Sequence, residues 1–206
     1  MSIVTYNNRS IANISAIPGA AKSLTHIKTL TASSSATLSF VDGSSDVVLD
    51  STYPIYKFEF INIHPATDGA SFQFNMSIDS GSNYNVTKTT TYFTAYNYES
   101  GGTPALTYAT NVDLAQSTAF QNVNSGVGSD NDQCAVGTLH LFNPSSTTFV
   151  KHFLTCGNTY ESSDLSSNVF VAGYGNTTSA VDAIQFKFSS GNIDAGTIKL
   201  YGLKDS

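Results

Sequence analysis

The sequence predicts an all-β protein: an antiparallel, jelly-roll-like β-sandwich preceded by a short extended N-terminal arm. Apolar and polar side chains alternate over residues 72–78, and again over residues 183–189 and 197–202. A period of two places one face of a strand on a core and the other face in water. The composition agrees, because Thr, Tyr and Phe favour strands whereas Ser, Asn and Gly favour turns. No long stretch has the 3.6-residue apolar period of a helix, and no β–α alternation indicates a parallel sheet.

Strands are expected from residue 27 onward, separated by turn signals. Residues 36–40 alternate and end at the turn signal Asp42-Gly43. Residues 56–63 and 72–78 flank Asp68-Gly69, and this spacing predicts a hairpin. Residues 84–98 are rich in Thr and Tyr and have a less apolar inner face, which is typical of an edge or solvated strand. Later strands are expected at residues 135–142, 149–156, 169–172, 183–189 and 197–202.

The N-terminal segment differs from the rest of the chain. Residues 1–25 carry scattered isoleucines without a strict period and are interrupted by Pro18-Gly19. This pattern predicts an arm that gains order by packing on another molecule, or alternatively an ordinary first strand with a frayed end. The domain would then comprise residues 26–206. The side chains expected to dock such an arm are Ile3, Tyr6, Arg9, Ile11 and Ile14.

The middle of the chain is weakly patterned over residues 99–132. Short ordered pieces are expected near residues 105–108 and 117–120, and residues 109–121 are the one segment where a short helix is expected. A long irregular stretch in a compact domain usually has a functional role or contacts a partner subunit.

Charge and hydropathy exclude several classes of partner. The net charge is −6 with only nine Lys and Arg, so the basic footprint of a nucleic-acid-binding protein is missing. No apolar run approaches the roughly 20 residues of a membrane-spanning helix. The first residues lack the apolar core of a signal peptide, so we expect synthesis in a cytoplasm without export by that route.

No catalytic, cofactor-binding or metal-binding constellation is predicted. The acids that a glycan-active enzyme would need have no visible partner: Glu59, Asp113, Glu161 and Asp164. His140 and His152 could pair across neighbouring strands as a metal or catalytic site, or could lie on a surface or interface.

Two further features leave alternatives open. Asp130 and Asp132 alternate in a polar loop, which fits either a Ca²⁺ ligand run or a solvated loop. Cys134 and Cys156 would form a disulfide only if strands brought them together, and are otherwise separate thiols.

A group of tyrosines offers a different type of site. Tyrosine beside Asn, Ser and Gly is the composition of adaptable recognition surfaces and of sugar-stacking sites. The alternatives are ordinary strand residues at the edge of a core, or a subunit interface. The tyrosines concerned are Tyr84, Tyr92, Tyr96, Tyr98 and Tyr108.

Two segments carry a resemblance to a known group of proteins. Residues 137–144 (GTLHLFNP) and 183–202 (AIQFKFSSGNIDAGTIKLYG) resemble the C-terminal β-sandwich of tailed-bacteriophage virion proteins, including those of marine phages. The start Asn7-Asn8-Arg9-Ser10-Ile11 also looks like the opening of such proteins. The resemblance covers about the last 70 residues and, loosely, the first 15.

The resemblance implies a non-enzymatic virion protein with no catalytic residues to carry over. We expect a homo-oligomer, specifically a trimer, that contacts other virion proteins. A tail fibre or adhesin that binds a host surface glycan is the first expectation, and a capsid decoration or head fibre protein is the second. A free lectin or a glycan-active enzyme on the same fold is the remaining alternative.

Overall fold

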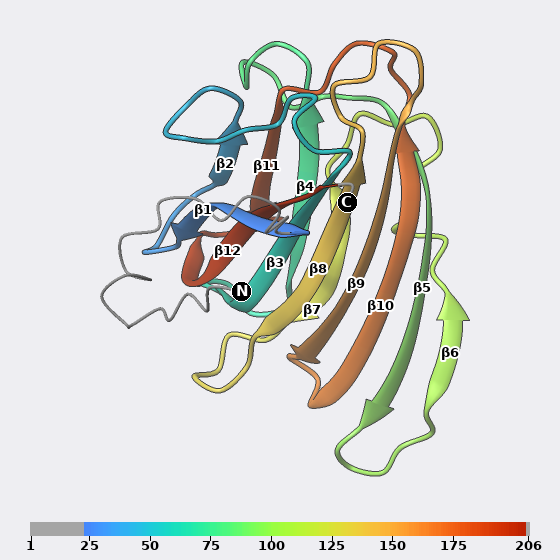
Figure 1. The fold of residues 1–206 in the computed structure, drawn as a ribbon. Helices are drawn as coiled ribbons and strands as arrows, with labels where there is room; N and C mark the ends of the chain where they lie inside the picture. The colour runs from blue at the N-terminus through green and yellow to red at the C-terminus, as the bar shows by residue number, and fades with distance from the viewer. Residues whose placement is uncertain (1–22, 205–206) are drawn as a thin grey trace, which may run out of the picture.

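The computed structural model describes residues 23–204, which form twelve β-strands and no helix (Figure 1). The all-β prediction is therefore confirmed. The strands are β1 (Leu24–Thr31), β2 (Leu38–Val41), β3 (Ile55–Pro65), β4 (Ala70–Ser77), β5 (Lys88–Tyr98), β6 (Ala105–Tyr108), β7 (Gln121–Val127), β8 (Ala135–Phe142), β9 (Lys151–Glu161), β10 (Leu165–Gly175), β11 (Ala183–Phe188) and β12 (Ile193–Leu203).

All strands belong to one antiparallel sheet that branches at β9. The main path runs β1-β12-β3-β8-β9-β7-β4-β11-β2. From β9 a second path leads through β10 and β5 to the short edge strand β6. The contact of β9 with β10 extends over the full length of both strands, whereas β7 meets β9 at Val127 and Glu161. The β10-β5-β6 branch therefore projects beyond the rest of the sheet (Figure 1).

The main path curls so that its two halves face each other across a core. Phe186 of β11 contacts the rings of Phe58 and Phe60 of β3 at centroid distances of 5.4 and 5.2 Å, although several strands separate β11 from β3 within the sheet. Facing layers of this type agree with the predicted sandwich, whereas its jelly-roll connectivity stays a prediction.

The predicted hairpin over residues 56–78 is wrong. β3 pairs with β12 and β8, whereas β4 pairs with β7 and β11. The two strands face each other across the core, where the rings of Phe60 and Phe72 lie 5.2 Å apart. The Asp68-Gly69 turn thus connects opposite layers, and the loop between β11 and β12 does the same. Burial of the aromatic faces against each other accounts for this arrangement.

The core centres on Phe186, which is fully buried. Besides Phe58 and Phe60, its ring lies 6.3 Å from Phe40, 5.8 Å from Phe72 and 6.4 Å from Phe74. These rings belong to β2, β3 and β4, so one side chain on β11 joins both layers. Edge-to-face and offset contacts of this kind add to the stabilisation that burial supplies.

The expected helix at residues 109–121 is also wrong. This segment lies beside β5 instead: the Lys88 amide donates to Ser117 O and the Thr90 amide donates to Leu114 O, both at 2.8 Å. Side chains of Thr, Asn, Asp and Ser in the segment compete for backbone bonds and disfavour a helix interior. Of the two expected ordered pieces, residues 105–108 form β6. The other, residues 117–120, lies just before β7 and is not part of a strand.

The predicted domain boundary lies close to the first strand. β1 begins at Leu24 and pairs with β12, so the last two residues assigned to the arm belong to the sheet. The expected docking residues Ile3, Tyr6, Arg9, Ile11 and Ile14 lie outside the described residues. Within residues 23–204, no helix is long and apolar enough to span a membrane.

We expect Phe186→Ala to lower the free energy of unfolding by about 3–5 kcal/mol, because it opens a cavity at the contact of both layers. Urea denaturation followed by circular dichroism measures this change. Phe149→Ala is the matched control, since its ring is 69% exposed and its loss should cost little. Equal losses in the two variants would contradict the central role of Phe186.

Candidate functional site

The five tyrosines considered for recognition do not form one surface. Tyr92 is a core residue whose hydroxyl lies 2.9 Å from Ser125 Oγ, and burial raises its pKa to about 12. Tyr96 and Tyr98 share its side of β5 and lie edge to face at 5.7 Å. Tyr108 pairs with Phe93 on the opposite side of the sheet, and Tyr84 lies in the loop between β4 and β5.

A polar pocket of about 510 Å³ opens at one end of β3. It forms because the β3–β8 register shifts between Phe60 and Ile63, where Asn62 has a left-handed φ of 51°. Gly196 of β12 has a φ of 118°, and a Cβ there would lie 2.5 Å from Asn62 O. A bulge of this kind redirects side chains and separates neighbouring strands. The lining residues are Asn62, His64, Asn131, Asp132, Gln133, Cys134, Asp194 and Ala195.

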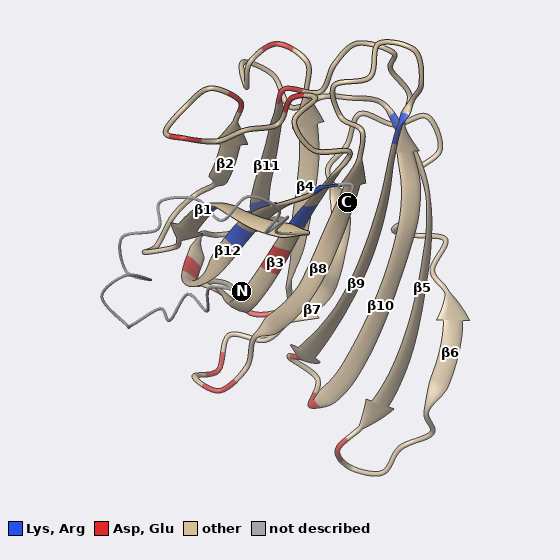
Figure 2. Cartoon of the chain, in the orientation of Figure 1, with Lys and Arg blue, Asp and Glu red and all other residues tan. Residues whose placement is uncertain are grey.

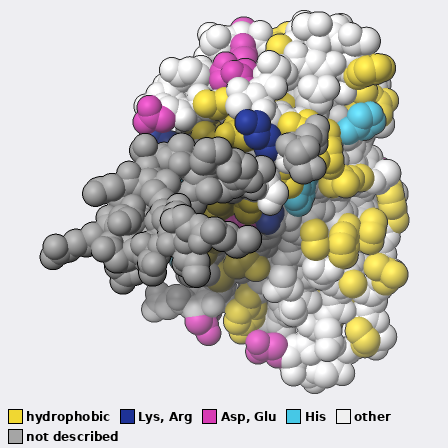
Figure 3. Space-filling model, viewed as in Figure 1, with side chains coloured by type: hydrophobic (Ala, Val, Ile, Leu, Met, Phe, Trp, Pro, Cys, Tyr) yellow, Lys and Arg dark blue, Asp and Glu magenta, His cyan; other side chains and the backbone are white. Residues whose placement is uncertain are grey.

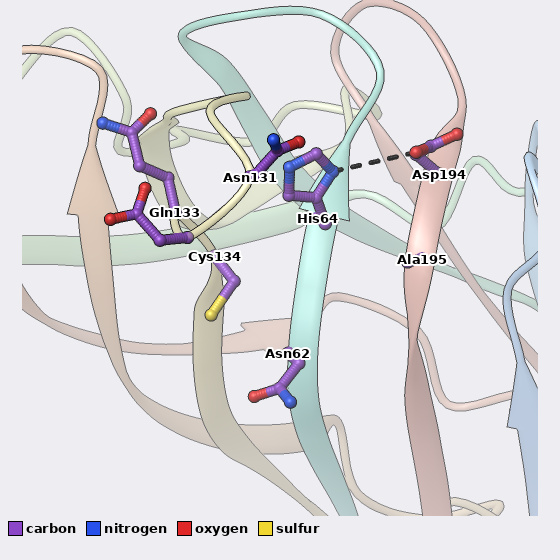
Figure 4. A pocket seen from close by; sticks show the side chains of 8 residues that line it. Asn62, His64, Asn131, Gln133, Cys134, Asp194 and Ala195 are labelled. Atoms are coloured by element: carbon purple, nitrogen blue, oxygen red, sulfur yellow. Dashed lines mark ion pairs between the residues drawn. The ribbon is translucent and has the colours of Figure 1, made fainter.

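Cys134, His64 and Asp194 are the residue types of a nucleophilic triad, but they are not assembled as one (Figure 4). His64 Nδ1 lies 4.0 Å from Asp194 Oδ2, and Nε2 lies 3.2 Å from the carbonyl of Asp130. His64 Nε2 therefore already has a hydrogen-bond partner in the backbone. Burial raises the pKa of the Cys134 thiol, which keeps it protonated. The pocket thus offers amides, carboxylates and an imidazole for hydrogen bonding.

The four acids considered for glycoside hydrolysis lie in three different places: on β3, beside Tyr108, and at the turn after β9. Glu59 forms an ion pair with Lys57 at 2.8 Å, which lowers the pKa of the carboxyl group. Asp113 accepts a hydrogen bond from the Tyr108 hydroxyl at 2.6 Å. Glu161 ends β9 and Asp164 lies in the following turn, and burial raises the pKa of Glu161.

The described residues considered for a metal site or a disulfide form neither. Among the described residues, no group of three or more His, Cys, Asp or Glu side chains could hold a metal ion. Asp130 and Asp132 are exposed in the β7–β8 loop. Cys134 and Cys156 are both free thiols.

The outer side of β8, β9, β10, β5 and β6 carries a group of exposed apolar side chains among uncharged polar ones, hereafter the apolar face. One cross-strand row consists of Thr138, Cys156, Phe170, Phe93 and Tyr108, each opposite the next. The rings of Phe93 and Phe170 stack at 5.1 Å. Figure 3 shows hydrophobic side chains in several groups on this side of the molecule. The exposed large side chains of this face are Val136, Leu154, Phe170, Phe93, Leu106 and Tyr108.

The five strands of the apolar face carry charged residues only at strand ends (Figure 2). The charged residues of these five strands are Lys88, Lys151 and Glu161, and all three lie on the inner side by strand alternation. His140 and His152 lie on the outer side, and burial together with the nearby Lys57 lowers the pKa of His140. Their placement fits the interface alternative better than a metal site.

The apolar face is hollowed rather than flat. A depression of about 330 Å³ is lined by Phe93, Leu154, Phe170 and the β8 residue His140, among others. A second depression of about 640 Å³ adjoins it beside Leu154, His152 and Tyr174. By contrast, Leu106 on β6 is 72% exposed and protrudes at the edge of the same face.

Two buried lysines were not singled out by the sequence. Lys88 and Lys151 both lie opposite Gly175, one on each side of β10. Lys88 Nζ donates to Asn75 Oδ1 at 2.5 Å and to Val86 O at 2.8 Å, whereas Lys151 Nζ donates to Phe149 O and Thr177 O. Burial lowers the pKa of both, that of Lys88 to about 7.

Comparisons with known proteins return no family model that matches the chain, and no match among curated proteins or solved structures. The resemblance to phage virion proteins therefore stays a prediction.

We expect the free energy of unfolding to rise with pH from about pH 7 to 9. The unfolded chain keeps the Lys88 proton up to a pKa near 10.5, whereas the folded chain releases it near 7, so the unfolded state binds more protons in this interval. One proton contributes at most about 1.4 kcal/mol per pH unit. Lys151 acts in the same direction.

Urea denaturation at several pH values checks this expectation. Lys88→Met should flatten the pH dependence, whereas the exposed-site control Lys204→Met should leave it unchanged. A wild-type slope equal to that of Lys88→Met would show that Lys88 keeps an ordinary pKa.

Proposed function

We propose that the chain is a non-enzymatic surface protein of a bacteriophage virion, in first place a tail fibre or adhesin component. The observation that carries the proposal is the apolar face. An antiparallel sheet usually turns a polar face to water on one side, whereas here the outer side of β5, β9 and β10 exposes the large apolar side chains Phe93, Leu154 and Phe170. Large exposed apolar surfaces of this kind are typical of contacts with other proteins. Such contacts are what a subunit of a larger particle needs.

The polar pocket supports the adhesin role within this proposal. Its lining includes the amides of Asn62 and Asn131 and the carboxylates of Asp132 and Asp194. Amides and carboxylates are hydrogen-bonding partners for sugar hydroxyl groups. A host surface glycan would therefore meet this pocket, rather than the dispersed tyrosines.

Antibodies against the chain should bind purified particles of the phage that encodes it, at the tail. Electron microscopy of gold-labelled particles measures this directly. Label spread over the capsid would instead support a decoration or head fibre protein. Absence of the chain from purified particles, by labelling and by mass spectrometry, would refute the virion proposal.

For the adhesin role, a glycan array probed with the purified chain should give binders that Asn131→Ala and Asp132→Ala reduce at least about tenfold, because each variant removes a hydrogen-bonding group. Ile78→Ala is the control, because Ile78 lies in the loop after β4, outside both the pocket lining and the apolar face, and this variant should bind as the wild type does. An array without binders, or equal loss in all three variants, would contradict glycan recognition by this pocket.

A further inference from the structure

We propose that the apolar face is the contact surface of a second copy of this chain, paired around a two-fold axis. This inference rests on the proposed assembly function and names the partner and the surface that the assembly uses. It concerns the outer side of β8, β9, β10, β5 and β6.

The charge of the face indicates the chemistry of its partner. Its five strands present no Lys, Arg, Asp or Glu side chain outward. A charged partner such as an acidic peptide would lose its hydration without gaining an opposite charge. The partner must therefore be uncharged and apolar at the contact. Among the described surfaces of this chain, the apolar face itself meets that requirement.

The shape of the face is self-complementary. Leu106 and Tyr108 protrude on β6 at one margin, with 72% and 51% of their surfaces exposed. The depression beside Leu154 and Ala172 extends from β5 across β10 and β9 to Thr138 and His140 of β8, at the other margin. A two-fold axis that lies between the two stacked faces, parallel to the strands, places β6 of each copy over β8 of the other. The protruding side chains of each copy then lie over the β8 end of the other copy's depression. This reciprocity is the property of an isologous interface.

The size of the face is sufficient for a pair. Five strands about 4.8 Å apart, with about 24 Å of strand length, give roughly 600 Å² per copy. Two copies would bury about 1,200 Å², which is at the lower end of stable, specific interfaces. Stacking of the two faces at about 10 Å would produce the layered packing of ordinary sheets.

This symmetry differs from the trimer expected from the resemblance. A three-fold assembly needs contact between two different patches, whereas this face is a single patch that complements itself. The mass of the assembly therefore distinguishes the two arrangements.

Sedimentation velocity of the full chain tests the pairing. We expect the wild type to sediment as two chains at about 10 µM, in the range of interfaces of this size. Leu154→Asp and Leu106→Asp each place a buried, unpaired charge in the contact and should raise the dissociation constant at least about 30-fold. Both positions are exposed in the single chain, so the fold should survive, which circular dichroism verifies.

Ile78→Asp is the matched control, because Ile78 is 43% exposed but lies in the loop after β4, away from the apolar face. It should leave the pair intact. A wild type that stays a single chain up to about 100 µM, a trimer, or equal effects of Ile78→Asp and Leu154→Asp would overturn the proposal.

The two free thiols provide an independent measurement. Cys156 lies in the central row of the apolar face, whereas Cys134 lines the polar pocket. Pairing should slow the reaction of Cys156 with N-ethylmaleimide relative to the Leu106→Asp variant and leave Cys134 unchanged. Equal Cys156 rates in both proteins would refute burial of this row. Because neither assay uses phage particles, pairing and virion location can fail separately.

Discussion

Contact between the aromatic rings of opposite layers is the interaction on which the rest of this fold depends. Phe186 contacts rings from β2, β3 and β4, and Phe74 extends the cluster to Phe153 of β9 at 4.9 Å. These contacts hold together strands that are far apart within the sheet. Without these contacts, nothing would stabilise the two halves of the main path against each other. β9, which carries the β10-β5-β6 branch, would also lose its packing partner Phe74.

That branch explains why one protein has two apolar surfaces of different type. On the inner side of β5, β9 and β10, Tyr92, Phe153 and Val171 are buried. On the outer side, Phe93, Leu154 and Phe170 are exposed, and no described element covers them. The core needs the first set. The second set forms no part of the buried core within residues 23–204, so its cost in solubility points to a contact beyond the described residues.

Sequence alternation predicted most strands but not their neighbours. The period of two over residues 72–78 and 183–189 corresponds to β4 and β11, because alternation reports which side of a strand is buried. It contains no information on whether β3 lies beside β4 or across from it, and the hairpin prediction failed for that reason. Composition likewise grouped five tyrosines that the fold disperses, since the composition of a segment does not distinguish the buried Tyr92 from the exposed Tyr108. The bulge at Asn62 that opens the polar pocket has no sequence signal beyond an ordinary strand end.

The placement of charge on β5 and β9 is the reverse of the usual pattern. Lys88, Lys151 and Glu161 lie on the inner side, where burial costs free energy, and the side open to solvent has none. The Lys88 amine donates hydrogen bonds to Asn75 and to a backbone carbonyl. Its lowered pKa reduces the free-energy cost of burial, because the neutral amine carries no charge. A surface that served only to keep the protein soluble would carry these charges outward. Their absence there is instead consistent with an outer face that is itself buried in an assembly.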